Sequence, residues 1–193
     1  MARLMVKYGK HGDAALLSHR ESMRALERAL RRSRLPLEFT SGYNPRPRMS
    51  FSPALPLGVE AEAEYLEVSV TGEVEEDAAV EALNRALPAG LSVREVRLLP
   101  PGMPKLSRWA RYGLYRLEGE GGILYLLLKV AGESQARLKD ALAAVSSRPG
   151  WSRGPRRVVR VGLYASPEEV CEDVQDEVYH YHAESGELRP VER

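Results

Sequence analysis

The sequence predicts an α+β fold made of two ferredoxin-like (βαββαβ) units in tandem, of which the second is incomplete. Three observations lead to this prediction. Stretches with strand-like and helix-like apolar spacing follow the order β-α-β-β-α-β over residues 1–99. A Pro-Pro-Gly-Met-Pro linker occupies residues 100–104. A shorter ββαβ pattern then covers residues 105–165, and an acidic tail covers residues 166–193.

Local signals mark the predicted elements of the first unit. Ser18 and Glu21 form a Ser-x-x-Glu capping box, which satisfies two backbone N–H groups at a helix start. Leu26 and Leu30 recur at helical spacing and should face the core, and Pro36 ends the helical region. The predicted elements are a strand at 3–9, a helix at 18–34, strand arms at 37–40 and 49–52, a strand at 64–70, a helix at 75–87 and a strand at 91–98.

The second unit starts with a predicted hairpin that turns at the Gly-Glu-Gly-Gly segment of residues 119–122. Its first helix is missing or reduced to residues 106–111. The acidic tail is expected to be a partly ordered appendage. The predicted elements are strands at 111–118 and 122–130, a helix at 133–146 and a strand at 156–164.

Charge is unevenly distributed along the 193 residues, although the net charge is only +1. Residues 1–48 carry +7 and residues 105–160 carry +8, whereas residues 49–104 and 161–193 carry −7 each. One interpretation is that these blocks neutralise one another across the fold. The other is that the two basic blocks form a face that attracts polyphosphate partners.

The sequence lacks the signals of several protein classes. It has no apolar run of about 18 residues and no signal-peptide pattern, so no membrane span or membrane partner is expected. A single cysteine, Cys171, excludes an internal disulfide and a three-thiolate iron–sulfur site, and it favours the cytoplasm. The nucleotide phosphate loop, the Gly-x-Gly-x-x-Gly motif and the Gly-x-Ser-x-Gly elbow are absent. We therefore expect no cofactor and favour a non-enzymatic protein.

Arginines gather on the side of the first predicted helix that faces away from its apolar residues. They are Arg20, Arg24, Arg28, Arg31 and Arg32, with no lysine among them. A guanidinium group presents a planar fork of donors that matches phosphate oxygens, which an ammonium group does not. This face is either an ordinary solvated surface or a phosphate-binding surface, and the choice of arginine over lysine favours phosphate.

The loop at residues 40–48, Thr-Ser-Gly-Tyr-Asn-Pro-Arg-Pro-Arg, is the most distinctive segment. Its two alternating prolines stiffen the chain into an extended form. Arg46 and Arg48 are therefore displayed with little entropy left to lose on binding. Tyr43, followed by Asn44, offers a ring on which a base could stack. The alternative is a rigid crossover whose arginines pair with nearby glutamates.

Glu60, Glu62 and Glu64 alternate along the chain, so they project from one side of an extended segment. Positions of the same parity become apolar from Leu66 onward, which predicts that the glutamates lie outside the core. Three close carboxylates could bind Mg²⁺. We expect them instead to support the site by pairing with the arginines of the loop and helix.

The histidines allow two further hypotheses. His19 opens the predicted helix, where the helix dipole favours a neutral imidazole that could act as a general base on a ribose hydroxyl. The alternative is a histidine near the helix cap with no catalytic role. His11, His180, His182 and Cys171 could supply metal ligands, but His-x-His spacing alone is a weak signal, and no metal site is predicted.

Three motifs carry a resemblance to a known family. They are Ser-His-Arg-Glu-Ser-Met-Arg at residues 18–24, Gly-Tyr-Asn-Pro-Arg-Pro at 42–47 and Leu-Pro-Leu-Gly-Val-Glu at 55–60. The sequence over about residues 16–67 resembles the radical-SAM-linked family, a bacterial domain of unknown function that is fused to or encoded beside a radical SAM enzyme. It departs from the family pattern at Arg20, where that pattern has leucine, and in its second half.

The resemblance implies a cytoplasmic, non-catalytic partner of a radical SAM enzyme, not itself a radical SAM enzyme. We expect it to bind RNA or present a substrate in RNA or ribosome-related metabolism. One alternative is a metal-independent endoribonuclease-like enzyme that uses His19. Another is a protein–protein adaptor that binds no nucleic acid. The residues expected to bind the anion or RNA are Arg20, Arg24, Arg28, Arg31, Tyr43, Asn44, Arg46 and Arg48.

Overall fold

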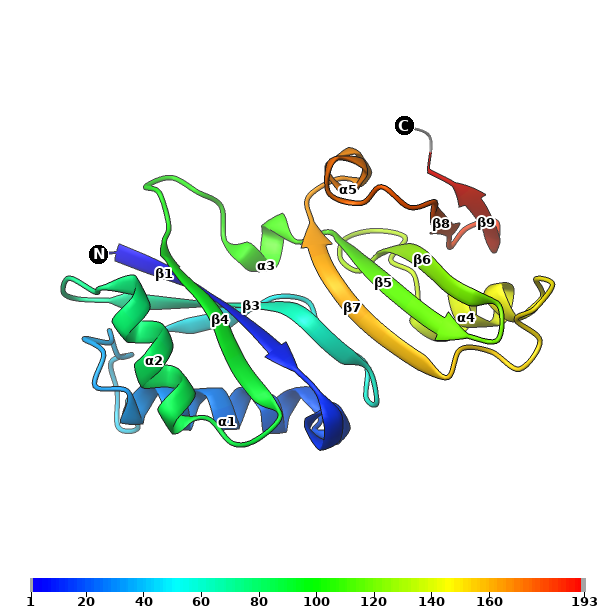
Figure 1. The fold of residues 1–193 in the computed structure, drawn as a ribbon. Coiled ribbons are helices and arrows are strands. Elements are labelled where there is room, and N and C mark those ends of the chain that lie inside the picture. The colour runs from blue at the N-terminus through cyan, green and yellow to red at the C-terminus, as the bar shows by residue number, and fades with distance from the viewer. Residues whose placement is uncertain (1, 192–193) are drawn as a thin grey trace. The chain divides into compact units, whose positions relative to one another are not determined.

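The computed structural model describes residues 2–191, apart from the side chain of Cys171, which lies outside the described part. These residues have a mixed α+β structure with nine strands and five α-helices. The chain divides into two compact units, Met1–Ser107 and Arg108–Arg193 (Figure 1). Within the described residues, no helix has the length and apolar character that a membrane crossing needs.

Four strands of the first unit form an antiparallel sheet in the order β4-β1-β3-β2. In this register Val6 of β1 lies opposite Leu66 of β3 and Val96 of β4. The strands and α-helices follow the predicted chain order, except that residues 37–40, predicted as a strand arm, form only the isolated bridges of Leu37 with Val70 and of Phe39 with Pro47. The elements are β1 (Ala2–Lys10), the 3-10 helix η1 (Gly12–Leu16), α1 (His19–Arg32), β2 (Met49–Phe51), β3 (Glu60–Val70), α2 (Glu76–Ala86) and β4 (Leu91–Leu98).

The core of the first unit lies on one face of this sheet. Val6 and Val68 point from β1 and β3 into a cluster that also contains Leu26 of α1 and Leu83 of α2. Burying a leucine or valine side chain stabilises a fold by about 1.5–3 kcal/mol. Both helices therefore cover the same face, and the alternate residues of β3, such as Glu67, point to the other face.

The start of α1 confirms the predicted capping box. The Ser18 side chain accepts a hydrogen bond from the backbone N–H of Glu21, and the Glu21 carboxylate accepts one at 2.8 Å from the backbone N–H of Ser18. The buried side chains of the helix include Leu26 and Leu30, as predicted from their spacing. Because the cap fixes where the helix begins, it also fixes which helix face carries the arginines.

Strand β3 is longer than the predicted strand at residues 64–70, because it already begins at Glu60. Ala61 pairs with Lys10 across a bulge in β1, so the glutamate segment belongs to the sheet. The expectation that the glutamates lie outside the core is wrong for Glu64, whose side chain is buried. The alternating glutamates lack the apolar pattern of a buried strand, so the sequence does not show that the strand already starts at them.

The second unit contains a sheet in the order β7-β5-β6-β8-β9, in which only the pair β6–β8 is parallel. The predicted hairpin, helix and strand are all present. Helix α4 begins five residues later than predicted, after Gly132 and Ser134 take positive φ values that a helix does not accommodate. The elements are α3 (Leu106–Trp109) at the boundary of the units, then β5 (Tyr112–Gly119), β6 (Gly122–Lys129), α4 (Leu138–Ser146), β7 (Arg157–Tyr164), α5 (Pro167–Asp173), β8 (Val178–His182) and β9 (Glu187–Pro190).

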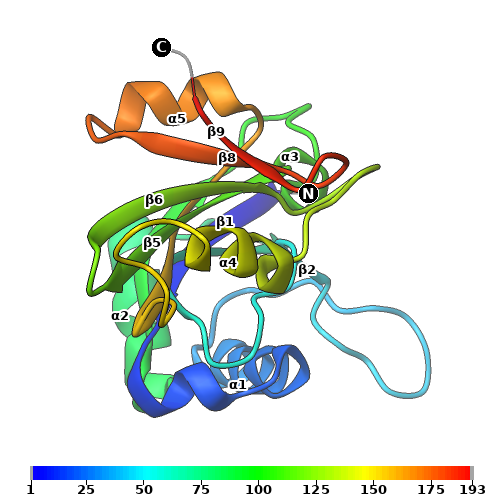
Figure 2. The same cartoon turned by 90° about the vertical axis from the view of Figure 1, so that its right-hand side faces the viewer.

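The acidic tail differs from the appendage that we expected, because it completes the second unit. Strand β8 runs beside β6, with Tyr179 opposite Leu126 (Figure 2). Val170 of α5 and Val178 of β8 are buried together with Leu114. These few apolar residues anchor the tail, while the acidic residues that dominate its composition are mostly more exposed.

Candidate anion-binding groove

A groove of about 1270 Å³ lies in the first unit between α1 and the loop of residues 40–48. Seven cationic side chains and two carboxylates line it among the described residues. The cationic residues are Arg3, Arg20, Arg24, Arg31, Arg46, Arg48 and Lys105, and the acidic ones are Glu27 and Glu67. The lining therefore has a formal charge of +5, which attracts anions.

Helix α1 supplies one wall of this groove. Arg20, Arg24 and Arg31 are separated by four and seven residues, so they lie along one side of the helix. All three line the groove. Arg28 lies outside the lining, on the exposed surface of the same helix, although it was predicted to join the others.

The loop of residues 40–48 forms the opposite wall and is held by hydrogen bonds as well as by its prolines. The backbone N–H of Thr40 donates to the carbonyl of Arg46 at 2.8 Å, and that of Arg48 donates to the carbonyl of Glu38 at 2.8 Å. Arg31 of α1 donates to the carbonyl of Pro45 at 2.8 Å, which ties the loop to the helix. The geometry of the groove is thus set before a ligand arrives.

Two residues of the loop motif occupy different places. Asn44 lines the groove, whereas Tyr43 stands at the loop tip with its side chain fully exposed and outside the lining. Beside the loop, Phe39 is 41% exposed, and the guanidinium of Arg31 lies 5.4 Å from the centroid of its ring. Two aromatic rings therefore reach solvent at the loop side of the groove.

The groove floor, formed by Arg3 of β1 and Glu67 of β3, contains an ion pair that the sequence did not reveal. Arg3 of β1 pairs with Glu67 of β3 at 3.1 Å, and the Glu67 carboxylate also accepts from the backbone N–H of Leu106 at 3.1 Å. Arg3 donates in addition to the carbonyl of Met103. These bonds hold the linker against the floor and bring Lys105 into the lining. The one sequence signal for this ion pair was the position of Glu67 between two apolar neighbours in a predicted strand.

The groove arginines other than Arg3, which pairs with Glu67, fall into two sets. Arg31 pairs with Glu27 at 3.0 Å and Arg48 pairs with Glu38 at 3.0 Å, so these guanidinium groups already have carboxylate partners. The second set is exposed and makes no side-chain hydrogen bond or ion pair with the described part of the chain; it consists of Arg20, Arg24 and Arg46. Exposed guanidinium groups without acceptors are available to a ligand.

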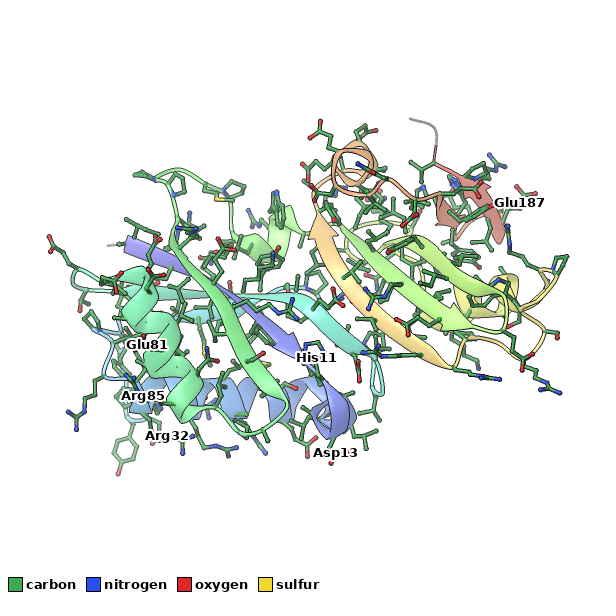
Figure 3. The ribbon with its side chains drawn as sticks, in the orientation of Figure 1. His11, Asp13, Arg32, Glu81, Arg85 and Glu187 are labelled. Carbon is green, nitrogen blue, oxygen red and sulfur yellow. The ribbon has the colours of Figure 1, made fainter. Side chains whose placement is uncertain are left out.

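Glu60, Glu62 and Glu64 do not line the groove. The carboxylate of Glu60 accepts from the backbone N–H of Gly12 at 3.2 Å and lies 3.9 Å from Nδ1 of His11, which is labelled in Figure 3. The groove arginines form their ion pairs instead with Glu27 of α1, Glu38 just before the loop and Glu67 of β3. The three alternating glutamates are thus placed apart from the groove.

His19 opens α1, as predicted, but its ring packs edge-on against Phe51 of β2, with ring centroids 5.8 Å apart. It does not belong to the groove lining. A general base must reach the proton that it removes, either directly or through one water. The arrangement therefore places the imidazole against an aromatic ring rather than among the groove arginines.

His180 and His182 stand next to each other on β8, with ring centroids 4.4 Å apart. Burial lowers the pKa of His180 to about 4, with further contributions from His182 and Lys129. His180 is therefore neutral at pH 7. Among the described residues, no three histidine, cysteine, aspartate or glutamate side chains gather in a way that could hold a metal ion.

The fold and the groove define a class: an α+β protein with a cationic groove carried by its first unit. A family model described as "Uncharacterized protein conserved in bacteria (DUF2344)" matches residues 3–155. Because this match covers most of the chain, the protein belongs to that bacterial family. The matched region contains every residue of the groove lining. No curated protein matches the chain in sequence.

Proposed function

We propose that this protein binds RNA through the groove of its first unit without catalysing a reaction on it. The observation that carries the proposal is the groove lining, with a formal charge of +5 and three arginines that lack acceptors. Arginine forks match phosphate oxygens and stay charged at all physiological pH values. Arg20, Arg24 and Arg46 would hold the phosphates.

The neighbouring aromatic rings favour a nucleic acid over a simple polyphosphate. Phe39 and Tyr43 are both exposed next to the cationic lining. Bases of an unpaired strand stack on such rings, and one stacked base contributes about 1–3 kcal/mol. A ligand that offers both phosphates and bases uses both features of the site, and RNA is such a ligand.

We further propose that the protein acts in the cytoplasm as a partner of a radical SAM enzyme, to which it would present its RNA. The support is the resemblance to the radical-SAM-linked family. Two of the three motifs that carry it, at residues 18–24 and 42–47, supply residues to the two walls of the groove. A common function of these motifs in ligand binding explains why they occur together.

A ferredoxin-like topology of the first unit is also part of this proposal. Its support is the antiparallel strand order β4-β1-β3-β2, joined by helices in the βαββαβ sequence, with both helices on one face. The exposed sheet face and the helix edge then remain accessible. In this molecule the groove uses that accessible side, because Glu67 and Ser69 of β3 line it.

The direct test is binding of a fluorescein-labelled oligouridylate over a range of salt concentrations, followed by fluorescence anisotropy. For single strands, the logarithm of the affinity falls with the logarithm of salt by about 0.7 for each phosphate contact. Three to five contacts predict a slope between about −2 and −3.5. Binding that is independent of salt, or absent at low salt, would contradict the proposal.

A second measurement distinguishes the RNA-binding function from a protein adaptor. The protein is purified from native bacterial lysate at low salt, any bound RNA is sequenced and bound proteins are identified. We expect an absorbance ratio at 260 and 280 nm above that of plain protein, together with a radical SAM enzyme. Recovery of the enzyme with no nucleic acid would support the adaptor instead.

A further inference from the structure

A second cationic hollow lies at the other side of α1, between the C-terminal ends of α1 and α2. This cleft has a volume of about 720 Å³. Three arginines and no acidic residue line it in the described chain. Its lining consists of Arg32, Ser33, Arg34, Ala82, Arg85, Ala86, Leu87 and Pro88. None of these residues belongs to the groove.

The three arginines of the cleft have different bonds. Arg32 donates to the carbonyl of Ala86 and so caps the end of α2, which is a structural role. Arg85 pairs with Glu81 at 3.4 Å, but both side chains are more than 70% exposed, so the pair contributes little (Figure 3). Arg34 is exposed and makes no hydrogen bond or ion pair with any described residue.

Arg34 also has an unusual backbone. Its φ of +61° lies in the left-handed region, which side-chain-bearing residues rarely adopt. The residue directly follows Ser33, the C-cap of α1, a position where a left-handed residue commonly ends a helix. Its side chain lines the cleft together with that of Arg85 of α2.

Two consecutive residues of α1 line the groove and the cleft. Arg31 lines the groove and the next residue, Arg32, lines the cleft, about 100° further around the helix. Arg28, one turn earlier, is exposed on the helix surface between these two directions. A band of arginines therefore leads from the groove around the end of α1 into the cleft. Arg28 therefore lies on the helix surface between the groove and the cleft.

We propose that the cleft is a second phosphate-binding site for the same RNA strand, an inference that rests on the proposed function of the groove. The path from Arg20 to Arg34 covers 14 residues, or about 21 Å at 1.5 Å per residue. That length corresponds to at most about six nucleotides, because 3.4 Å is the spacing of stacked nucleotides along one strand and an unpaired strand can extend further. The path bends around the helix end, which a stiff duplex does not follow, so the ligand is an unpaired strand.

The test compares a four-nucleotide and a twelve-nucleotide oligouridylate on the full chain. The double variant Arg34→Gln/Arg85→Gln should weaken binding of the longer strand about 100-fold, because two charge-assisted contacts are lost. Its salt slope should become shallower by about 1.4, or 0.7 for each contact. Binding of the shorter strand, which fits within the groove, should change less than about twofold.

Two single variants serve as controls. Arg94→Gln removes one exposed positive charge from β4, outside both hollows, and should leave both strands unaffected. Glu81→Gln releases Arg85 from its carboxylate and should tighten binding of the longer strand only. Thermal denaturation of each variant shows whether the fold is retained. The substituted side chains are all exposed, so we expect no loss of stability.

The comparison with a groove variant separates the two proposals. Arg24→Gln/Arg46→Gln should weaken both strands. If it does so while the cleft variant leaves the longer strand unchanged, the inference about the cleft is overturned and the proposed function stands. If wild-type protein binds neither strand, or the groove variant binds both normally, the proposed function fails, and the inference fails with it. Equal loss for both strands in the cleft variant also overturns the inference.

Discussion

The two basic blocks of the sequence, residues 1–48 and 105–160, have similar net charge, but their arginines have different partners in the structure. In the second unit, Arg153 and Arg156 both reach Glu120, at 3.1 and 2.9 Å, and Arg116 reaches Glu118 at 2.9 Å. In the first unit, the arginines of α1 and the loop outnumber the acids that they contact, and three of those lining the groove keep exposed guanidinium groups without acceptors. Net charge along a segment therefore does not show where arginines lack carboxylate partners in space.

Strand register explains part of this difference. The pairing of β5 with β7 places Glu118 directly opposite Arg157, and Glu120 lies in the turn between β5 and β6. Strand pairing thus brings one of these acids opposite an arginine of the second unit. The groove arginines of α1 stand on a helix edge, where the nearest partner, Glu27, is one turn away from Arg31 and satisfies only that residue. Arginines along a helix edge can keep their guanidinium groups without carboxylate partners, whereas an arginine opposite an acid on a neighbouring strand is paired.

The largest expected effect tests this contrast directly. Arg24→Gln/Arg46→Gln should lower RNA affinity about 100-fold, because each charge-assisted hydrogen bond contributes about 1.5 kcal/mol or more. Arg153→Gln/Arg156→Gln removes the same charge from the second unit and should change affinity less than about twofold. Fluorescence anisotropy at low salt measures both. Similar losses for the two variants would show that only overall charge matters.

The next effect concerns stability and compares two carboxylates that each hold two partners. Glu67 is buried, so Glu67→Gln leaves Arg3 without its counter-charge and should destabilise the fold by about 2–3 kcal/mol. The Glu120 side chain is 41% exposed, and Glu120→Gln should cost less than about 1 kcal/mol. Urea denaturation followed by circular dichroism gives both values, and a smaller cost at Glu67 would contradict the role assigned to the groove floor.

A smaller effect is expected at the helix starts. Ser18→Ala should cost about 1 kcal/mol, because the capping hydrogen bonds of α1 are lost. Arg137 stands at the N-cap of α4 and makes no capping bond, so Arg137→Ala should be nearly neutral.

Hydrogen bonds from Ser18 hold the pKa of Glu21 below its ordinary value of 4.5. That part of the stabilisation is present above pH 4.5 and is lost as the pH falls through the lowered pKa, which urea denaturation at several pH values detects.

The last prediction concerns His180, whose side chain is partly buried. Its pKa in the folded protein is about 4, against an ordinary value of 6.5, so the unfolded chain binds the proton more readily. Stability should therefore fall as the pH drops from 6.5 towards 4. His180→Gln should remove part of this loss. Thermal denaturation at pH 7 and pH 4.5 measures the difference, and an identical pH dependence in the variant would exclude His180 as its source.

Most elements were predictable because their signals are local. The capping box at Ser18 and the spacing of Leu26 and Leu30 depend only on neighbouring residues, and the structure confirms them. The errors fall where distant partners decide. The strand character of Glu60 depends on pairing with β1, and the order of the tail depends on β6, which accepts β8 as a parallel neighbour.

The groove shows the same division. The sequence by itself determined that arginines share one helix side and that a proline-stiffened loop carries two more, because helical geometry and proline act within a few residues. The pair of Glu27 with Arg31 follows from their i,i+4 spacing on α1, but only the tertiary structure brings Glu38 to Arg48 and Glu67 to Arg3. It also brought Arg3 and Lys105 to the lining from the two ends of the first unit. Ion pairs between distant residues leave no periodic signal, so folding alone selects them.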